Sequence, residues 1–314
     1  MKPKVIFIDS VHPILFKRLE SAGYECHWKT DSDRDEILSI LEQYEGAVIR
    51  SKFKFNQEVF DVANKLKWIA RSGAGMENID QSIAASRNIK CYNSPEGNRD
   101  AVAEHAIGML LNLFNNLIQA DDEVRNAEWN REKNRGIELK GKTVGILGFG
   151  YMGEAFAQRL QGFEVNIIAY DKYKQGFGNK LVREVDEATF FKKTEVLSIH
   201  LPLTKETTFL VNQEYINKFS NPLFIINTAR GRNLKTDDLV VAIKSEKVLG
   251  ACLDVLEYEK TSFEQLKSEE LPEAFRFLKR SEKVILSPHV AGWTEESYYK
   301  LSNVLADKIL SMNG

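Results

Sequence analysis

The sequence predicts an α/β protein with two doubly wound parallel sheets. Short apolar runs of strand length alternate with longer stretches of helical periodicity along the chain. This alternation is typical of parallel strands joined by right-handed helical crossovers. The 314 residues are enough for two domains of the usual size, about 100–200 residues each. A glycine-rich turn starts only at Gly148, so residues 1–98 are expected to form a domain of their own.

Nine apolar runs have the length of buried strands. They are Lys4–Ile8, Ala47–Arg50, Trp68–Arg71, Thr143–Leu147, Val165–Tyr170, Val196–His200, Leu223–Asn227, Val248–Leu253 and Val284–Leu286. Amphipathic stretches such as Pro13–Ala22 and Asp237–Glu246 separate them, and a last helix is expected over Glu295–Met312. The charged stretch Thr261–Arg280, which contains Pro272, predicts a surface insertion.

Residues Ala101–Asn126 predict one long helix. No charged residue falls between Glu104 and Asp121, and the polar side chains of this interval recur at helical spacing, so that they form one stripe. They are Asn112, Asn115, Asn116 and Gln119. Two interpretations stay open, namely a buried core helix and a helix that lies between domains or at a subunit interface.

Composition excludes several classes of protein. A net charge of −2 and a pI of about 6.3 give no reason to expect binding to nucleic acid or to an acidic membrane. The N-terminus lacks the long apolar region of a signal peptide, and no run of about 20 apolar residues predicts a membrane span. The scattered cysteines Cys26, Cys91 and Cys252 favour reduced thiols in the cytoplasm. The five histidines lack metal-ligand spacing, so no metal site is expected.

The stretch TVGILGFGYMG, residues 143–153, has the spacing of a dinucleotide-binding turn. Gly148 would permit the tight turn, Gly150 would let the backbone approach a pyrophosphate, and Gly153 would let the following helix pack closely. Asp171 ends the next strand, near the distance of about 20 residues expected for the acid that binds the adenosine ribose. An acid there favours NAD over NADP, because it repels a 2′-phosphate. The alternative is a structural glycine turn in an unrelated α/β protein.

Candidate catalytic side chains follow three later strands. Arg230 suits a carboxylate, His289 suits proton transfer near neutral pH, and a carboxylate such as Glu259 would orient the imidazole ring and favour the imidazolium. Because carboxyl ends of parallel strands face one crevice, these residues are expected at one site. Each has a plainer alternative: a surface salt bridge for Arg230, a turn cap for Asp254, a solvated charge for Glu259, and a buried core histidine for His289.

These motifs together resemble the D-isomer-specific 2-hydroxyacid dehydrogenase family over nearly the whole chain. The matching stretches, in order, are RSGAGMENID, GKTVGILGFGYMG, AYD, HLPLTKETTFLVN, INTARG, LDVLEYE and SPHVAG. The resemblance implies two Rossmann-like or flavodoxin-like domains with a cleft between them. It also implies that the C-terminal helix returns to the first domain. The expected domains are therefore 1–98 plus 289–314 for the substrate and 99–288 for NAD, with a homodimer built on the cofactor domains.

The resemblance also implies residue roles. Arg230 would hold the substrate carboxylate and carbonyl, His289 would be the general acid and base, and Glu259 would pair with His289. The backbone of the substrate loop, Ser72, Gly73, Ala74 and Gly75, would bind the carboxylate. Besides the three glycines, the residues implied to contact NAD are Tyr151, Met152, Asp171, Thr228, Ala229, Asp254, Ala291 and Gly292. Two features depart from most members: Lys260 follows Glu259 where proline is usual, and the stretch from Glu259 to His289 is longer.

The substrate expectation depends on two further stretches. AVIRSKFKF, with Arg50 and Ser51, resembles the segment that phosphoglycerate dehydrogenases use near the phosphate. EWNREKNRGIEL, with Arg131, resembles the segment that supplies a further arginine from a partner subunit. The favoured reaction is therefore 3-phosphoglycerate to 3-phosphohydroxypyruvate, the entry to serine biosynthesis. A chain that ends at Gly314 is expected to lack the regulatory domain of the longer forms, and with it feedback by serine through that domain.

Other functions stay open. Arg50 and Arg131 are ordinary surface charges in the plainer interpretation, which leaves hydroxypyruvate or glyoxylate reduction and D-lactate oxidation as alternatives. An alternative of another class is an NAD-sensing binding protein similar to the family's corepressors. The intact set of Arg230, Glu259 and His289 argues against that class.

Overall fold

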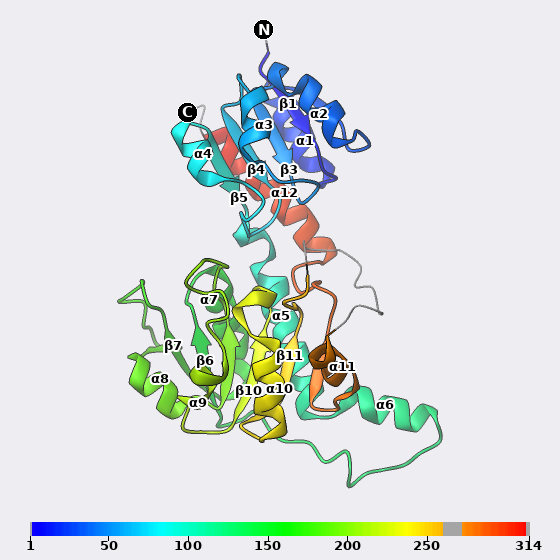
Figure 1. Ribbon diagram of the computed structural model, residues 1–314, viewed down its shortest axis with the longest axis vertical. Coiled ribbons are helices and arrows are strands. Elements are labelled where there is room, and N and C mark those ends of the chain that lie inside the picture. Colours follow the sequence, from blue (N-terminus) through cyan, green and yellow to red (C-terminus); the bar gives the residue numbers. More distant parts are fainter. Residues whose placement is uncertain (1, 260–271, 312–314) are drawn as a thin grey trace. The chain divides into compact units, whose positions relative to one another are not determined.

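A computed structural model describes residues 2–259 and 272–311. The chain forms two compact units, one comprising Met1–Arg99 and Trp293–Gly314, the other Asp100–Gly292 (Figure 1). Residues 289–292 therefore belong to the second unit. Each unit contains one parallel β-sheet with helices on both faces, and this confirms the predicted fold class.

The first unit has a five-stranded sheet in the order β2-β1-β3-β4-β5. Its strands are β1 (Lys4–Phe7), β2 (Glu25–Trp28), β3 (Gly46–Ile49), β4 (Trp68–Arg71) and β5 (Lys90–Asn93). Its helices are α1 (Pro13–Ser21), α2 (Arg34–Ile40), α3 (Gln57–Val62), α4 (Gln81–Ser86) and α12 (Glu295–Leu310), together with the start of α5. The order reverses between β1 and β3, as in flavodoxin-like sheets. The C-terminal helix α12 packs on α1 and buries Leu305, Ala306 and Ile309 in the core of this unit.

The second unit has a seven-stranded sheet in the order β12-β11-β10-β9-β6-β7-β8. Its strands are β6 (Thr143–Leu147), β7 (Asn166–Tyr170), β8 (Arg183–Glu184), β9 (Val196–Ile199), β10 (Leu223–Asn227), β11 (Val248–Leu253) and β12 (Val284–Leu286). Its helices are α5 (Pro95–Phe114), α6 (Leu117–Arg125), α7 (Tyr151–Arg159), α8 (Glu187–Lys193), α9 (Gln213–Asn217), α10 (Thr236–Lys244) and α11 (Glu273–Arg280). The order reverses between β6 and β9, which is the arrangement of dinucleotide-binding sheets. Two hydrophobic clusters cover the sheet.

The prediction of one helix over Ala101–Asn126 is wrong, because the chain breaks between α5 and α6. Asn116 has a left-handed backbone, with φ of 53°, and Asn115 folds back to donate to the carbonyl of Leu111. The end of α5 is capped by a segment that is distant in the sequence, since Ile137 N donates to the carbonyl of Phe114 at 2.9 Å. The polar residues that were read as one stripe therefore lie around the break between the two helices. Neither α5 nor any other described helix is long and apolar enough to cross a membrane.

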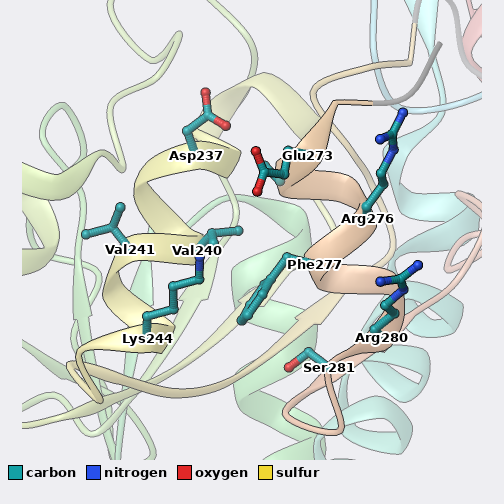
Figure 2. A pocket seen from close by; sticks show the side chains of 10 residues that line it. Asp237, Val240, Val241, Lys244, Glu273, Arg276, Phe277, Arg280 and Ser281 are labelled. Atoms are coloured by element: carbon teal, nitrogen blue, oxygen red, sulfur yellow. The ribbon is translucent and has the colours of Figure 1, made fainter.

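The prediction of a surface insertion over Thr261–Arg280 is wrong for its last part, which forms α11. Residues 260–271 lie outside the described residues, but α11 buries Ala274 and Leu278 in the core of the second unit. This amphipathic helix lies beside α10, and side chains of the two helices line a groove of about 750 Å³. Figure 2 shows Phe277 directed from α11 toward α10, where the ammonium of Lys244 lies 5.1 Å from its ring centroid. The residues that line this groove include none of the predicted site residues.

Candidate active site at the sheet edge of the second unit

The predicted site residues of the second unit follow the carboxyl ends of its strands. All strand pairs in this sheet are parallel, so their carboxyl ends share one edge. The glycine turn follows β6 and Asp171 follows β7. Arg230, Asp254 and His289 come after β10, β11 and β12. The topology therefore places these loops along the edge where ligands bind in open α/β sheets.

The glycine turn leaves room for a phosphate at the start of α7. Gly148 has φ of +89°, and a Cβ there would lie 2.7 Å from the carbonyl oxygen of His200 on the neighbouring loop. A Cβ at Gly153 would meet the carbonyl oxygen of Gly148 at 2.4 Å, so the helix packs onto the turn itself. Gly150 is the N-cap of α7 without a side-chain cap, and a Cβ there would have open space around it. The open helix start fits the pyrophosphate of a dinucleotide.

Asp171 lies against this turn. Its Oδ2 accepts a hydrogen bond from Phe149 N at 2.8 Å, and its Oδ1 accepts from Tyr173 N and Lys174 N at 3.0 Å each. Desolvation, the largest single effect, raises the pKa of Asp171, but these backbone hydrogen bonds together hold it below its usual value. The side chain is therefore ionised at neutral pH. About one of its four acceptor positions stays open for a ribose hydroxyl.

The turn after β10 is held by a residue that the sequence analysis missed. Asn227 is fully buried; its Nδ2 donates to the carbonyl of Arg230 at 3.0 Å, and its Oδ1 accepts from Ala229 N at 3.1 Å. Asparagine forms such turns with its own neighbours, and this was the signal in INTARG. The buried hydroxyl of Thr228 has no hydrogen-bond partner among the described residues. An unpartnered hydroxyl at this edge fits a bound cofactor.

The turn that carries Arg230 packs closely against the turn that leads to Glu259. A Cβ at Gly231 would lie 1.9 Å from the carbonyl oxygen of Leu256, so only glycine lets the turn after β10 approach the turn after β11. Glu259 Oε1 accepts from Leu256 N at 2.5 Å, which fixes its carboxylate in that second turn. Arg230 itself is partly buried, and its Nη1 donates to the carbonyl of Ala229 at 2.7 Å.

The side chains of Glu259 and His289 form a short hydrogen bond. Glu259 Oε2 lies 2.7 Å from His289 Nδ1, and both side chains are only about one-fifth exposed. The contact forms despite the unusual sequence after Glu259. The contact fixes the orientation of the imidazole ring through Nδ1. The neighbouring Glu257 has a structural role instead, since it accepts from Thr236 N at 2.6 Å.

The loop that carries His289 is held by Asp254. His289 has a left-handed backbone, with φ of 55°, which is uncommon for a side chain of this kind. Asp254 is 1% exposed and accepts from Val290 N and Ala291 N at 2.9 Å each, and from the hydroxyl of Ser287 at 2.6 Å. These hydrogen bonds fix the backbone on both sides of His289. The plainer interpretation of Asp254, a cap on the turn after its own strand, is therefore wrong, because these side-chain bonds go to the loop after β12. The sequence alone did not single out Ser287.

A second missed residue lies behind this loop. His105 on α5 places Nε2 at 2.9 Å from Ser287 Oγ and 3.5 Å from Asp254 Oδ1. His200, which follows β9, differs from His289 in its electrostatics. Desolvation by burial lowers the pKa of His200 to about 4, so its ring is neutral at pH 7. His200 is therefore unsuited to act as a general acid and base near neutral pH.

The first unit carries the predicted substrate loop. Ser72–Gly75 follows β4, and Gly73 has φ of +150° with the guanidinium of Arg71 packed where a Cβ would lie. The loop is tied to the end of β5, because Ser94 N donates to the carbonyl of Gly73 and Asn93 Nδ2 donates to that of Ala74. In the described part of the chain, the N–H groups of residues 73–75 have no acceptor. Consecutive amides of this kind can bind a carboxylate.

Arg50 and Ser51 lie beside this loop, since β3 and β4 are paired up to Ile49 and Arg71. Asp9 Oδ2 accepts from the backbone N–H groups of Arg50 and Ser51 at 2.5 and 3.1 Å. The guanidinium of Arg50 lies 3.9 Å from the ring centroid of Trp293. Desolvation lowers the pKa of Arg50 from its ordinary value, but an arginine stays charged. The Arg50 side chain is thus held in one place.

The remaining predicted residues are distributed as follows. Tyr151 and Met152 begin α7, and Ala291 and Gly292 end the second unit. Arg131 is exposed, in the segment after α6, and does not follow a strand of the sheet as Arg230, Asp254 and His289 do. No group of three or more His, Cys, Asp or Glu side chains in residues 2–259 and 272–311 could hold a metal ion.

Comparison with known proteins identifies a single family. Residues 107–291 match the model described as D-isomer specific 2-hydroxyacid dehydrogenase, NAD binding domain. The chain is 34% identical over 311 residues to D-3-phosphoglycerate dehydrogenase of Archaeoglobus fulgidus. The matched region covers 98% of this chain and 57% of that protein. It is 33% identical over 282 residues to hydroxypyruvate reductase of Thermotoga maritima, which covers 90% of this chain and 89% of the relative.

A solved structure agrees with the fold. A protein of Pyrococcus horikoshii superposes with a TM-score of 0.81 at 27% identity, over 99% of this chain and 92% of that one. The chain spans only about half the length of the Archaeoglobus relative but nearly all of the Thermotoga and Pyrococcus proteins.

Proposed function

Because the chain belongs to the D-isomer-specific 2-hydroxyacid dehydrogenase family, we propose that it transfers hydride between a D-2-hydroxy acid and NAD. The observation that carries this proposal is the hydrogen bond between Glu259 and His289 at the sheet edge that also bears the glycine turn. A proton-exchanging group beside a nicotinamide site is what oxidation of an alcohol requires.

In this proposal His289 moves the proton. Its Nδ1–H donates to Glu259, so Nε2 takes the hydroxyl proton in oxidation and returns it in reduction. The carboxylate of Glu259 stabilises the positive ring that forms in between. Asp254 and Ser287 keep the ring in position by holding the loop. NAD, when bound, accepts the hydride from C2 and leaves a 2-keto acid.

Other residues hold the two reactants. The open start of α7 at Gly150 and the carboxylate of Asp171 would hold the pyrophosphate and ribose of NAD, with Thr228 beside them. Arg230 would bind the substrate carboxylate and carbonyl, because its planar fork makes two parallel hydrogen bonds. The amides of residues 73–75 would bind the carboxylate from the first unit, whereas the amide of Ser72 donates to the carbonyl of Ile49 at 2.8 Å. We propose that the first unit is the substrate domain and the second unit the NAD domain.

We further propose that the substrate is 3-phosphoglycerate, the product 3-phosphohydroxypyruvate, and the pathway serine biosynthesis. Arg50 supports this because its guanidinium is held against Trp293 beside the substrate loop. A phosphate group needs such a cation. The name of the Archaeoglobus relative agrees with this substrate, whereas that of the Thermotoga relative favours hydroxypyruvate. The unpaired thiols of Cys26, Cys91 and Cys252 are consistent with a cytoplasmic enzyme.

A panel of 2-keto acids tests the reaction and the substrate together. We expect NADH oxidation to be fastest, by kcat/KM, with 3-phosphohydroxypyruvate, followed by hydroxypyruvate, glyoxylate and pyruvate. The margin should be about tenfold or more, the value of one well-placed phosphate contact. Replacing Arg50 with methionine should remove the preference for the phosphorylated substrate and leave turnover of hydroxypyruvate.

Two outcomes of this panel contradict different parts of the proposal. A preference for hydroxypyruvate that Arg50→Met leaves unchanged would refute the phosphate assignment and favour a hydroxypyruvate or glyoxylate reductase. NADH binding without turnover of any 2-keto acid would refute the dehydrogenase and favour an NAD-sensing binding protein.

We propose that the enzyme is a homodimer built on the second unit. Helix α6 projects away from the sheet of this unit (Figure 1) and leaves Leu117, Ile118 and Val124 more than half exposed. Exposed apolar side chains in a row are typical of a protein interface. Arg131 lies in the segment that follows α6, so a partner subunit could receive it at its phosphate site.

A charged substitution on α6 tests the dimer. Ile118→Asp should convert a dimer of about twice the chain mass into a monomer at micromolar concentration, because it places a carboxylate in an apolar interface. Val241→Asp on α10 is the matched control, since Val241 is 54% and Ile118 57% exposed. Light scattering after gel filtration measures both masses. A monomeric wild-type chain, or an Ile118→Asp chain that stays dimeric, contradicts the proposal.

A further inference from the structure

Two lysines lie within three residues of the acid that faces the ribose. Lys172 and Lys174 flank Tyr173 in the turn that follows Asp171. A cation beside the ribose 2′ position is what NADP-binding sites use to hold the 2′-phosphate. Asp171 alone therefore does not explain a preference for NAD. The positions of both ammonium groups also matter.

The side chain of Lys174 contacts Phe149 in the glycine turn. Its ammonium donates to the carbonyl of Phe149 at 3.1 Å and lies 5.3 Å from the ring centroid of that residue. Phe177 stacks on Phe149 with ring centroids 4.6 Å apart and adds a second aromatic face near the ammonium. A hydrogen bond and cation–π contacts together hold this ammonium at Phe149.

Lys172 is held by Glu206, which comes from the loop after β9. The carboxylate of Glu206 forms an ion pair with the Lys172 ammonium and accepts a hydrogen bond from the hydroxyl of Tyr173. These bonds lower the pKa of Glu206 and raise that of Lys172, so both groups are charged at neutral pH. Since β6 lies between β7 and β9, Glu206 links the two loops that flank the glycine turn.

We propose that Glu206 determines cofactor specificity by holding Lys172 and Tyr173, so that no free cation reaches the ribose 2′ position. The negative charge of Glu206 adds to that of Asp171, and together they disfavour the 2′-phosphate of NADPH. Asp171 thus binds the ribose of NADH, while Glu206 withdraws the lysine that would otherwise stabilise NADPH. The inference depends on NAD binding by the second unit and not on the substrate.

Binding measurements on three variants test this role without any turnover. The Kd values of NADH and NADPH are measured by fluorescence titration for the wild type, Glu206→Gln, Lys172→Met and the double variant. Glu206→Gln should bind NADPH about fivefold more tightly, the size of one exposed charge pair, with little change for NADH. The double variant should lose this gain, and the gain should shrink as ionic strength rises, because exposed charges are screened.

Glu214→Gln is the matched control, because Glu214 is an exposed glutamate on α9 that also lies near a lysine, Lys218. It should leave both Kd values unchanged. An unaltered NADPH Kd in Glu206→Gln would overturn the proposal, as would a gain that persists in the double variant. Weaker binding of both cofactors would assign Glu206 to the shape of the loops and would likewise overturn it.

Discussion

Replacing His289 with asparagine is expected to lower kcat for reduction of a 2-keto acid by about 10²- to 10⁴-fold, the range that a positioned general acid contributes. The reason lies in the ring contacts. Glu259 engages Nδ1 at 2.7 Å and orients the ring, and in the proposed mechanism Nε2 performs the proton transfer. Asparagine retains a polar side chain but has no group that titrates near neutral pH. The Kd for NADH should change little.

Asparagine is also chosen for the backbone. His289 has φ of 55°, and among residues with a side chain asparagine adopts the left-handed region most readily. A loss of activity in His289→Asn therefore does not arise from strain in the loop that Asp254 holds. His289→Ala would combine both effects.

His27→Asn is the control for the histidine substitution. His27 lies on β2 of the first unit, where its ring contacts the hydroxyl of Tyr44 and the carboxylate of Glu25. This variant should keep wild-type kcat. Steady-state kinetics and NADH titration of both variants make the comparison, and near-normal turnover by His289→Asn would rule out the assigned role.

Strand prediction succeeded for every strand inside the two sheets and for one outermost strand, β12. The predicted strands Thr143–Leu147 and Leu223–Asn227 are β6 and β10, inside the larger sheet. The three strands that were not predicted, β2, β5 and β8, are all outermost in their sheets. An outermost strand pairs on one side only and exposes more of its surface, so its sequence, such as KCYN, lacks the continuous apolar run that identifies a buried strand.

The end of α5 could not be predicted from periodicity, because its cause is distant in the sequence. The segment at Gly136 packs against the carbonyl of Phe114 so closely that a Cβ would lie 2.7 Å away. Local helical spacing continues through Asn115 and Asn116 and gives no sign of this contact. Tertiary packing here overrides local preference.

The sequence predicted that the candidate site residues follow strand ends at one sheet edge, but it did not predict the residues that hold them there. Strand ends in a parallel sheet share one edge, so the positions of Arg230 and His289 could be inferred from order alone. Of the residues that fix them, Asn227 carries only the general turn preference of asparagine, and Ser287 carries no signal of its own. The close approach that requires Gly231 depends on the path of the neighbouring loop, which the sequence does not encode locally.

Replacing Arg230 with lysine is expected to lower kcat/KM for every 2-keto acid by about 10²- to 10³-fold, the effect of removing one donor aimed at the charge that develops in the transition state. Lysine keeps the charge but not the planar fork, and a point charge cannot bind a carboxylate and a carbonyl in fixed geometry. Both a higher KM and a lower kcat should result. Steady-state kinetics with a saturating concentration of NADH measures each constant.

Arg232→Lys provides the matched control, because Arg232 lies two residues away in the same turn and packs over Phe209 at 5.4 Å. It should retain wild-type kinetics. The two possible roles of Arg230 differ in their effect on the cofactor, since Thr228 and Ala229 belong to the same turn. If lysine disturbs only the substrate, the Kd for NADH stays constant while KM rises. A parallel loss of NADH affinity would instead assign Arg230 to the shape of the turn, because Asn227 holds its backbone carbonyl.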